Sequence, residues 1–184
     1  MLKLLRAACV ALALVPASGF AATLGFDVHA NNHVWNNGSG YGGNLGLDTG
    51  LDFNAGDVFS VSVNDISDTW NFCVGGSLAS CEVNASGERS NTTILGNYAN
   101  SGYSFAYGAL VGRVGNGDFF EIGTSGFIGA ADATGRLSLF HWDHNTNNDG
   151  LISVKVNTAV VPLPAGMTLL LSALGVFGLV RRVG

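Results

Sequence analysis

The sequence predicts an all-β protein, an antiparallel β-sandwich or jelly roll, over most of its length. Three observations support this fold class. No helical periodicity persists between Ala22 and Val160, apolar and polar residues alternate there over short segments, and glycine and asparagine separate the segments. Alternation is typical of strands with one face in a core, and the separating residues favour turns. About 140 residues suffice for one core.

Residues 1–21 have the composition of a secretion signal helix. Lys3 and Arg6 supply a positive start, and the apolar run that follows is too short to span a bilayer. We expect cleavage after Ala21 or Ala22, although a membrane-retained helix is the alternative. The β domain is then expected over residues 22–159.

Segments 57–64 and 151–157 show the alternation most clearly, because every second residue in each is apolar. Their core-facing residues should be Phe59, Val61, Val63, Ile152, Val154 and Val156. Other strands are expected near residues 24–30, 47–53, 105–113, 117–123 and 135–142.

Two polar stretches, from Asn31 to Asn44 and from Gly75 to Asn100, are expected to form long loops. Once Cys9 leaves with the signal, Cys73 and Cys81 remain as an even pair in an oxidising compartment. We therefore expect a disulfide between them. In the chain-entropy model it would stabilise the fold by about 2–3 kcal/mol.

The two ends carry half of the positive charge. They hold four of the eight Lys and Arg residues and none of the thirteen acidic ones, which leaves the domain with a formal charge of −9. Its basic residues are scattered: Arg89, Arg113, Arg136 and Lys155. Binding to nucleic acid requires clustered basic residues, so no nucleic-acid partner is expected. Excess carboxylates favour divalent cations instead.

Residues 160–184 combine a short motif, an apolar stretch and a basic end. The motif and end consist of Val161, Pro162, Leu163, Pro164, Ala165, Arg181 and Arg182. A helix over the apolar stretch from Ala165 to Val180 would rise about 24 Å, less than the roughly 30 Å of a hydrocarbon core. Its terminal arginines would stay cytoplasmic, with the domain outside the inner membrane.

This tail resembles the VPLPA-type PEP-CTERM sorting signal, which an exosortase membrane peptidase recognises. The resemblance implies that the apolar helix holds the protein in the inner membrane transiently. The domain would then be released or transferred to the cell envelope or extracellular matrix. A plain single-pass anchor is the alternative.

The segment from Asp143 to Gly150 concentrates the oxygen ligands that calcium prefers. Asp143, Asn145 and Asn147 have the spacing of the first, third and fifth positions of an EF-hand loop. Asn148 stands where an EF-hand requires glycine, so this loop is not an EF-hand. A polar hairpin turn would have the same composition, and both interpretations remain open.

Several segments recur in order in a known family: Asp48–Leu51, Asn54–Val58, Asp68–Trp70, Gly108–Gly115, Leu137–Phe140, Asp143 and Asn147–Gly150. Over most of residues 24–158 the chain thereby resembles the bacterial galactose-binding calcium lectins. The resemblance implies that Asp143, Asn147 and Asn148 bind calcium, together with a carbonyl near Thr146. It also implies that Asp143 and Asn147 reach sugar hydroxyls.

Galactose specificity is not implied, because the loop after Asp143 is about three residues shorter than in those lectins. The lectins' sugar-contacting histidine and glutamine also have no counterpart before Gly108. Trp142 and Trp35 are candidates for stacking on a pyranose, although a tryptophan in a sandwich is more often buried.

We therefore expect an exported module that binds an extracellular polysaccharide or another glycan through calcium. A structural protein of the exopolysaccharide or biofilm matrix, without a defined sugar pocket, is the alternative. Catalysis is not expected, since the chain has no Gly-x-Ser-x-Gly or His-Glu-x-x-His motif. The four histidines, His29, His33, His141 and His144, are expected to be ordinary strand and loop residues.

Overall fold

The computed structural model describes residues 22–35, 46–72, 81–89, 96–143 and 148–158. All of them belong to one of the two compact units of the chain, Ala21–Ala159. The expected signal helix, the sorting motif with its arginines, and the C-terminal helix lie outside the described residues. Within those residues, no helix has the length and hydropathy needed to cross a membrane.

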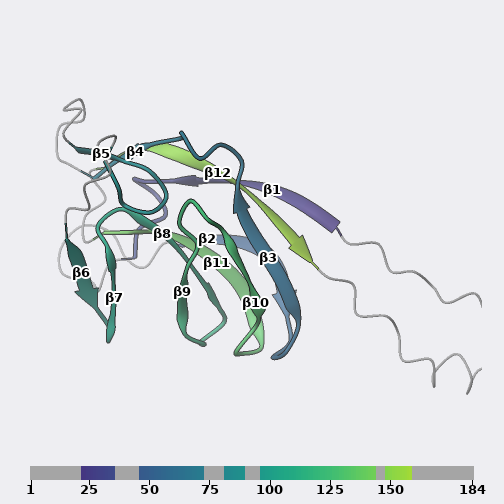
Figure 1. The fold of residues 1–184 in the computed structure, drawn as a ribbon. Coiled ribbons are helices and arrows are strands. Elements are labelled where there is room, and N and C mark those ends of the chain that lie inside the picture. Colours follow the sequence, from purple (N-terminus) through teal and green to yellow (C-terminus); the bar gives the residue numbers. More distant parts are fainter. Residues whose placement is uncertain (1–21, 36–45, 73–80, 90–95, 144–147, 159–184) are drawn as a thin grey trace, which may run out of the picture. The chain divides into compact units, whose positions relative to one another are not determined.

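The described chain is all-β, as expected, with antiparallel sheets (Figure 1). The larger sheet has the order β10-β3-β12-β4-β5, with β1 also paired to β12, and the smaller has the order β2-β11-β8-β9. β6 and β7 form a separate hairpin. The strands are β1 Ala22–His29, β2 Leu47–Phe53, β3 Val58–Val63, β4 Trp70–Asn71, β5 Glu82–Val83, β6 Asn97–Asn100, β7 Tyr103–Ala106, β8 Ala109–Val114, β9 Phe119–Glu121, β10 Phe127–Ala130, β11 Gly135–Trp142 and β12 Asp149–Thr158.

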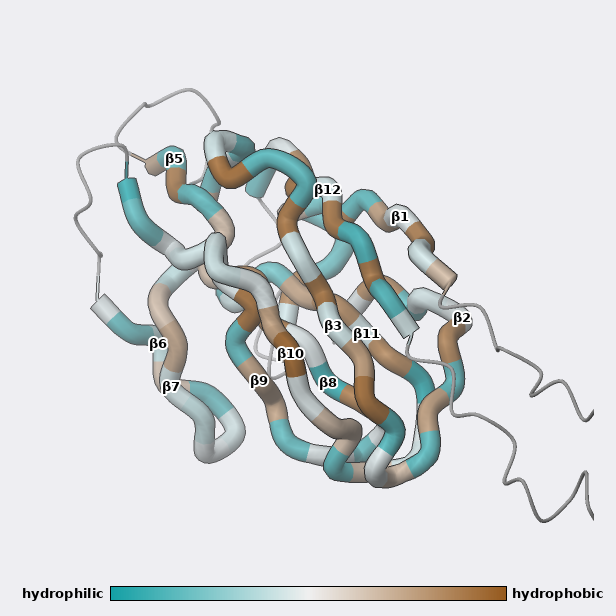
Figure 2. Tube along the Cα trace, turned by 45° about the vertical axis from the view of Figure 1, so that its right-hand side comes forward, coloured by the Kyte–Doolittle hydropathy of each residue, from teal (hydrophilic) through white to brown (hydrophobic). Residues whose placement is uncertain are grey.

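Strand β12 organises the larger sheet. β1 pairs with it along Leu151–Thr158, while β3 and the short β4 pair with successive parts of it, with Val63 opposite Val154 and Trp70 opposite Gly150. Apolar and polar residues alternate along β3 and β12 (Figure 2). The predicted core residues of both strands are buried, except Val63, which is partly buried against the core, so the predicted facing is confirmed.

The two sheets pack face to face around one apolar core, so the fold is a β-sandwich. The larger sheet contributes Val28 and Ile152, for example, and the smaller sheet contributes Leu110 and Leu137. A Leu or Ile side chain gains about 1.5–3 kcal/mol on full burial. Packing in this core therefore fixes the position of the two sheets relative to each other.

The opposite face of the smaller sheet is also covered. Ala109 and Val111 of β8 and Phe140 and Trp142 of β11 lie there in a second apolar cluster, against the β6–β7 hairpin. This cluster, which we call the outer cluster, also contains Trp35, Tyr98, Tyr103, Phe105, Ala106 and Phe119. Strand β8 and the second half of β11, Leu139–Trp142, are consequently buried on both faces.

The structure corrects two expectations about loops and strands. The stretch from Gly75 to Asn100, expected to be a loop, contains β5 and β6. The strand expected near 105–113 is two strands, β7 and β8, separated by a turn at Tyr107–Gly108. Gly108 has a φ of +75°, a conformation that interrupts a strand.

The sandwich core predicts different costs for two isoleucines on strands of the same sheet. Ile152→Ala should lower the free energy of unfolding by about 2–5 kcal/mol, because Ile152 is fully buried between the sheets. Ile128→Ala should change it by less than about 0.5 kcal/mol, because Ile128 on β10 is 83% exposed. Urea denaturation of both variants measures the difference, and equal losses would contradict the packing described here.

Candidate functional site

Asp143 follows the last residue of β11, where the ladder with β8 ends. Trp142 pairs with Ala109, and the Gly108 amide donates to the Trp142 carbonyl at 2.9 Å. The Asp143 side chain is only 1% exposed, an unusual position for a carboxylate. Two predicted partners in the loop, Thr146 and Asn147, lie outside the described residues.

Asn148, which precedes β12, is held close to the end of β11. Its side chain is 5% exposed. Its amide nitrogen donates to the Ala30 carbonyl at 3.3 Å and lies in hydrogen-bond contact with Nδ1 of His141 at 3.2 Å. Because the oxygen and nitrogen of an amide diverge from one carbon, these contacts turn the amide oxygen away from Ala30 and His141.

His141 is a buried histidine, and its contact with the Asn148 amide helps to orient that side chain. Burial lowers the pKa of its imidazole to about 3, opposed by a hydrogen bond to the Ala30 backbone, so the ring is neutral at neutral pH. The ring packs edge-on against Trp70, with centroids 4.4 Å apart. The Trp70 indole nitrogen in turn donates to the Gly108 carbonyl at 2.7 Å.

The two tryptophans considered for sugar stacking both belong to the outer cluster. Trp142 is completely buried, and its indole nitrogen donates to the Tyr98 carbonyl at 2.7 Å. Its ring would have to leave the cluster to reach a sugar, so its position does not support the stacking role. Trp35 is half-buried and packs its ring against Phe119 and Phe140.

Two tyrosines that the sequence did not single out lie close to Asp143. The rings of Tyr98 and Tyr107 are stacked, with centroids 5.2 Å apart and planes 21° from parallel. Burial raises the pKa of both phenols, and the negative charge of Asp143 raises each further. Both side chains are half-buried. No local motif marks them, since they come from the hairpin and the turn after it.

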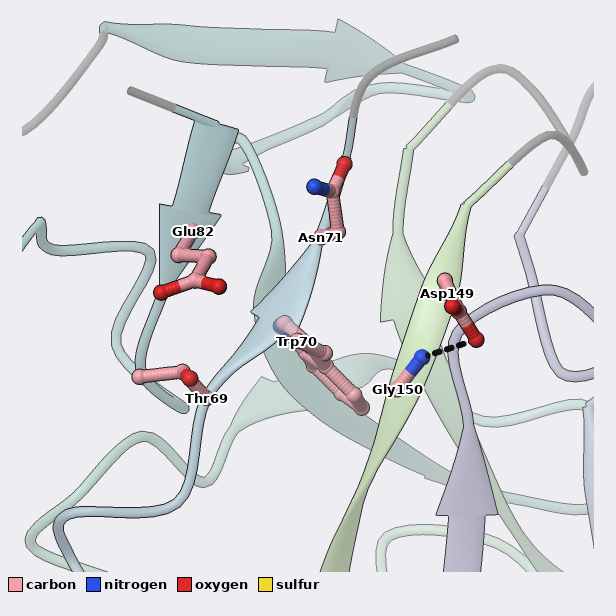
Figure 3. A pocket seen from close by; sticks show the side chains of 6 residues that line it. All are labelled: Thr69, Trp70, Asn71, Glu82, Asp149 and Gly150. Carbon is pink, nitrogen blue, oxygen red and sulfur yellow. Dashed lines mark hydrogen bonds between the residues drawn. The ribbon is translucent and has the colours of Figure 1, made fainter. Parts of the chain in front are cut away.

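A polar hollow of about 130 Å³ lies at the start of β12, lined there by Asp149 and Gly150, the residues that follow Asn148 in the chain. Glu82, Asn71 and Asp149 occupy paired positions on β5, β4 and β12, so their side chains share one face of the sheet. Figure 3 shows the Glu82 and Asp149 carboxylates on either side of the β4 segment. The lining residues are Thr69, Trp70, Asn71, Glu82, Asp149 and Gly150. The hollow is thus rich in hydrogen-bond acceptors.

Cys81, next to Glu82, is buried and disulfide-bonded. Cys73 lies outside the described residues, so its pairing with Cys81 stays a prediction.

The packing around His141 predicts a high cost for a methyl group at Gly108. Its Cβ would lie 2.5 Å from a Val83 methyl and 3.4 Å from Nε2 of His141. Gly50 has a similar φ, +69°, but nothing lies within 4 Å of a Cβ there. Gly50→Ala should therefore cost about 1–2 kcal/mol for the backbone alone, and Gly108→Ala about 1–3 kcal/mol more. Urea unfolding measures both variants, and equal costs would refute the close packing.

Comparison with known proteins finds no matching family model and no matching curated protein. Among solved structures, the chain is similar to one described as "EclA N-terminal domain; PllA-like lectin". The identity is 20% and the TM-score 0.48, over 73% of this chain and 95% of that one.

Proposed function

We propose that this protein binds carbohydrate through a calcium ion held where β11 ends and β12 begins. The observation that carries the proposal is the Asp143 carboxylate, which is almost fully buried where β11 ends. A buried carboxylate is costly unless its charge is compensated, and a cation provides such compensation. The proposal concerns binding, not catalysis.

The donor chemistry here fits calcium better than a transition metal. Asp143 and Asn148 offer carboxylate and amide oxygens, which are hard ligands, whereas zinc sites use cysteine and histidine. Throughout the described ranges, no three His, Cys, Asp or Glu side chains come together as a metal site. A calcium site would therefore depend on amide and carbonyl oxygens, with Asn147 and the Thr146 carbonyl as the expected further ligands.

Two features support carbohydrate as the ligand. Sugar hydroxyls can replace water on calcium, whose coordination shell takes six to eight oxygens. The hollow at the start of β12 supplies the Glu82 and Asp149 carboxylates, which can accept hydrogen bonds from further hydroxyls. The sequence resemblance to calcium-dependent lectins at Asp143 and Asn148 is consistent with this chemistry.

For delivery, we propose that the signal at residues 1–21 directs export and that an exosortase-type peptidase processes the tail at 160–184. The sequence of these ends supports this proposal. The domain would reach the cell envelope or extracellular matrix after a transient stay in the inner membrane. A glycan-binding domain would there encounter its ligand.

Calcium should raise the melting temperature of the full chain, purified in detergent, because a ligand of the native state stabilises it. At a concentration 100 times the dissociation constant, the gain is about 2.7 kcal/mol. Asp143→Asn should abolish the gain. Glu121→Gln, which also removes one charge but at an exposed position at the end of β9, should retain it. The absence of any calcium effect on the wild type would refute the metal site.

A glycan array, probed with and without chelator, separates a lectin from a matrix protein that uses calcium only to order its loop. A lectin should bind particular sugars in calcium and lose them in chelator and in Asp143→Asn. A calcium-stabilised protein that binds no sugar under either condition would favour the structural alternative.

Mass spectrometry of the protein recovered from its producing cells tests the proposed delivery. The mature chain should begin after Ala21 or Ala22 and lack the residues beyond about Ala165. An intact apolar tail with Arg181 and Arg182 would indicate a permanent anchor instead.

A further inference from the structure

The two nitrogens of the His141 imidazole lie in different surroundings. Nδ1 is in hydrogen-bond contact with the Asn148 amide nitrogen at 3.2 Å. Among the described residues, Nε2 has no hydrogen-bond partner. A Cβ added at Gly108 would lie 3.4 Å from Nε2 and 2.5 Å from a Val83 methyl, so this side of the ring is closely packed. The polar contact that His141 offers is therefore the one with Asn148.

The Asn148 amide nitrogen has two hydrogens and two acceptors. It lies 3.3 Å from the Ala30 carbonyl oxygen and 3.2 Å from Nδ1 of His141. When Nδ1 carries the lone pair, each hydrogen of the amide has its own acceptor. The opposite tautomer would set an N–H of the imidazole against an N–H of the amide. The contact thus fixes both the amide plane and which end of the amide is the oxygen.

Packing alone does not account for a histidine at this position. The side chain is completely buried, and one of its two nitrogens has no hydrogen-bond partner among the described residues. A buried polar atom left without a partner lowers stability, whereas a leucine of similar size would bury only apolar atoms. The imidazole is consequently better suited to orienting a neighbouring side chain than to filling the core.

The backbone of His141 holds the other acceptor in place. Its amide donates to the His33 carbonyl at 2.7 Å, and its carbonyl accepts from the Trp35 amide at 3.1 Å. These bonds fasten the segment after Ala30 to β11. They do not involve the imidazole, so a substitution at His141 removes the Nδ1 contact while the backbone bonds beside Ala30 remain available.

We propose that His141 is a positioning residue of the calcium site, which holds the Asn148 amide so that its oxygen is presented to the cation. The proposal rests on the calcium site proposed above and adds a residue that does not itself touch the cation. Calcium is bound by the oxygen of an amide, whereas the nitrogen is only a donor. A contact that fixes the nitrogen therefore fixes the oxygen as well. Loss of such an outer contact typically weakens metal binding about 10–100-fold.

Calorimetric titration of calcium chloride into the full chain, purified in detergent, tests the proposal with three variants. His141→Asn carries an amide oxygen as many bonds from the backbone as Nδ1, so it can still accept from Asn148. His141→Leu has no acceptor, and His141→Gln has its amide one bond further out, as Nε2 is. The dissociation constant should stay within about threefold of the wild type in His141→Asn and rise at least about tenfold in the other two.

Urea unfolding in chelator is the second readout, because it separates positioning from packing. His141→Asn leaves a space and a polar group in the core, so it should unfold at lower urea than His141→Leu. The order of stability should thus be the reverse of the order of calcium affinity, whereas a residue that only packs would give the same order in both. Leu137→Ala, at a buried position near the other end of β11, is the control: it should lose stability and keep the calcium affinity.

Calcium binding as tight as that of the wild type in His141→Leu or His141→Gln would overturn the positioning role. An equal loss in His141→Asn, or in Leu137→Ala, would overturn it too, because destabilisation alone would then explain the effect. If His141→Leu fails to fold, His141→Gln decides against His141→Asn. A wild type that binds no calcium would instead refute the proposed function, and the role of His141 would fall with it.

Discussion

The burial of β11 on both faces is the constraint on which the rest of the structure depends. Leu137 and Leu139 point into the core between the sheets, whereas Phe140 and Trp142 point into the outer cluster. A shift of one residue would exchange these two sets and leave both layers mispacked. The register of β11 against β8 is therefore fixed, and the position where β11 ends is fixed too.

That constraint explains how a carboxylate comes to be buried. Asp143 directly follows Leu139–Trp142, the part of β11 that is buried on both faces, so it lies within the protein rather than at its surface. His141 comes two residues earlier and contacts Asn148 across the loop, which holds the start of β12 against the end of β11. The core thus determines the positions of Asp143 and Asn148, the described residues on either side of 144–147.

Local sequence pattern predicted the parts of the fold in which each strand has one buried face. In β3 and β12 apolar residues alternate with polar ones, and the apolar residues predicted to face inward pack in the core between the sheets. The pattern failed where burial depends on a distant segment. The polar stretch that contains β5 and β6 shows no alternation over its two- and four-residue strands. The sequence left Trp142 as a candidate for sugar stacking, because nothing in β11 itself indicates that the β6–β7 hairpin covers this side chain.

The candidate site, like the fold, follows only in part from local sequence. Asp143 and Asn148 were recognisable because oxygen ligands were concentrated in one stretch of sequence. His141, Trp70 and the tyrosine pair reach the site from separate strands and could be found only in three dimensions. The β6–β7 hairpin has two roles here, since it covers the outer face of the smaller sheet and carries Tyr98. In this arrangement the positions of Asp143 and Asn148 depend on the core, whereas the position of Tyr98 depends on the covering layer.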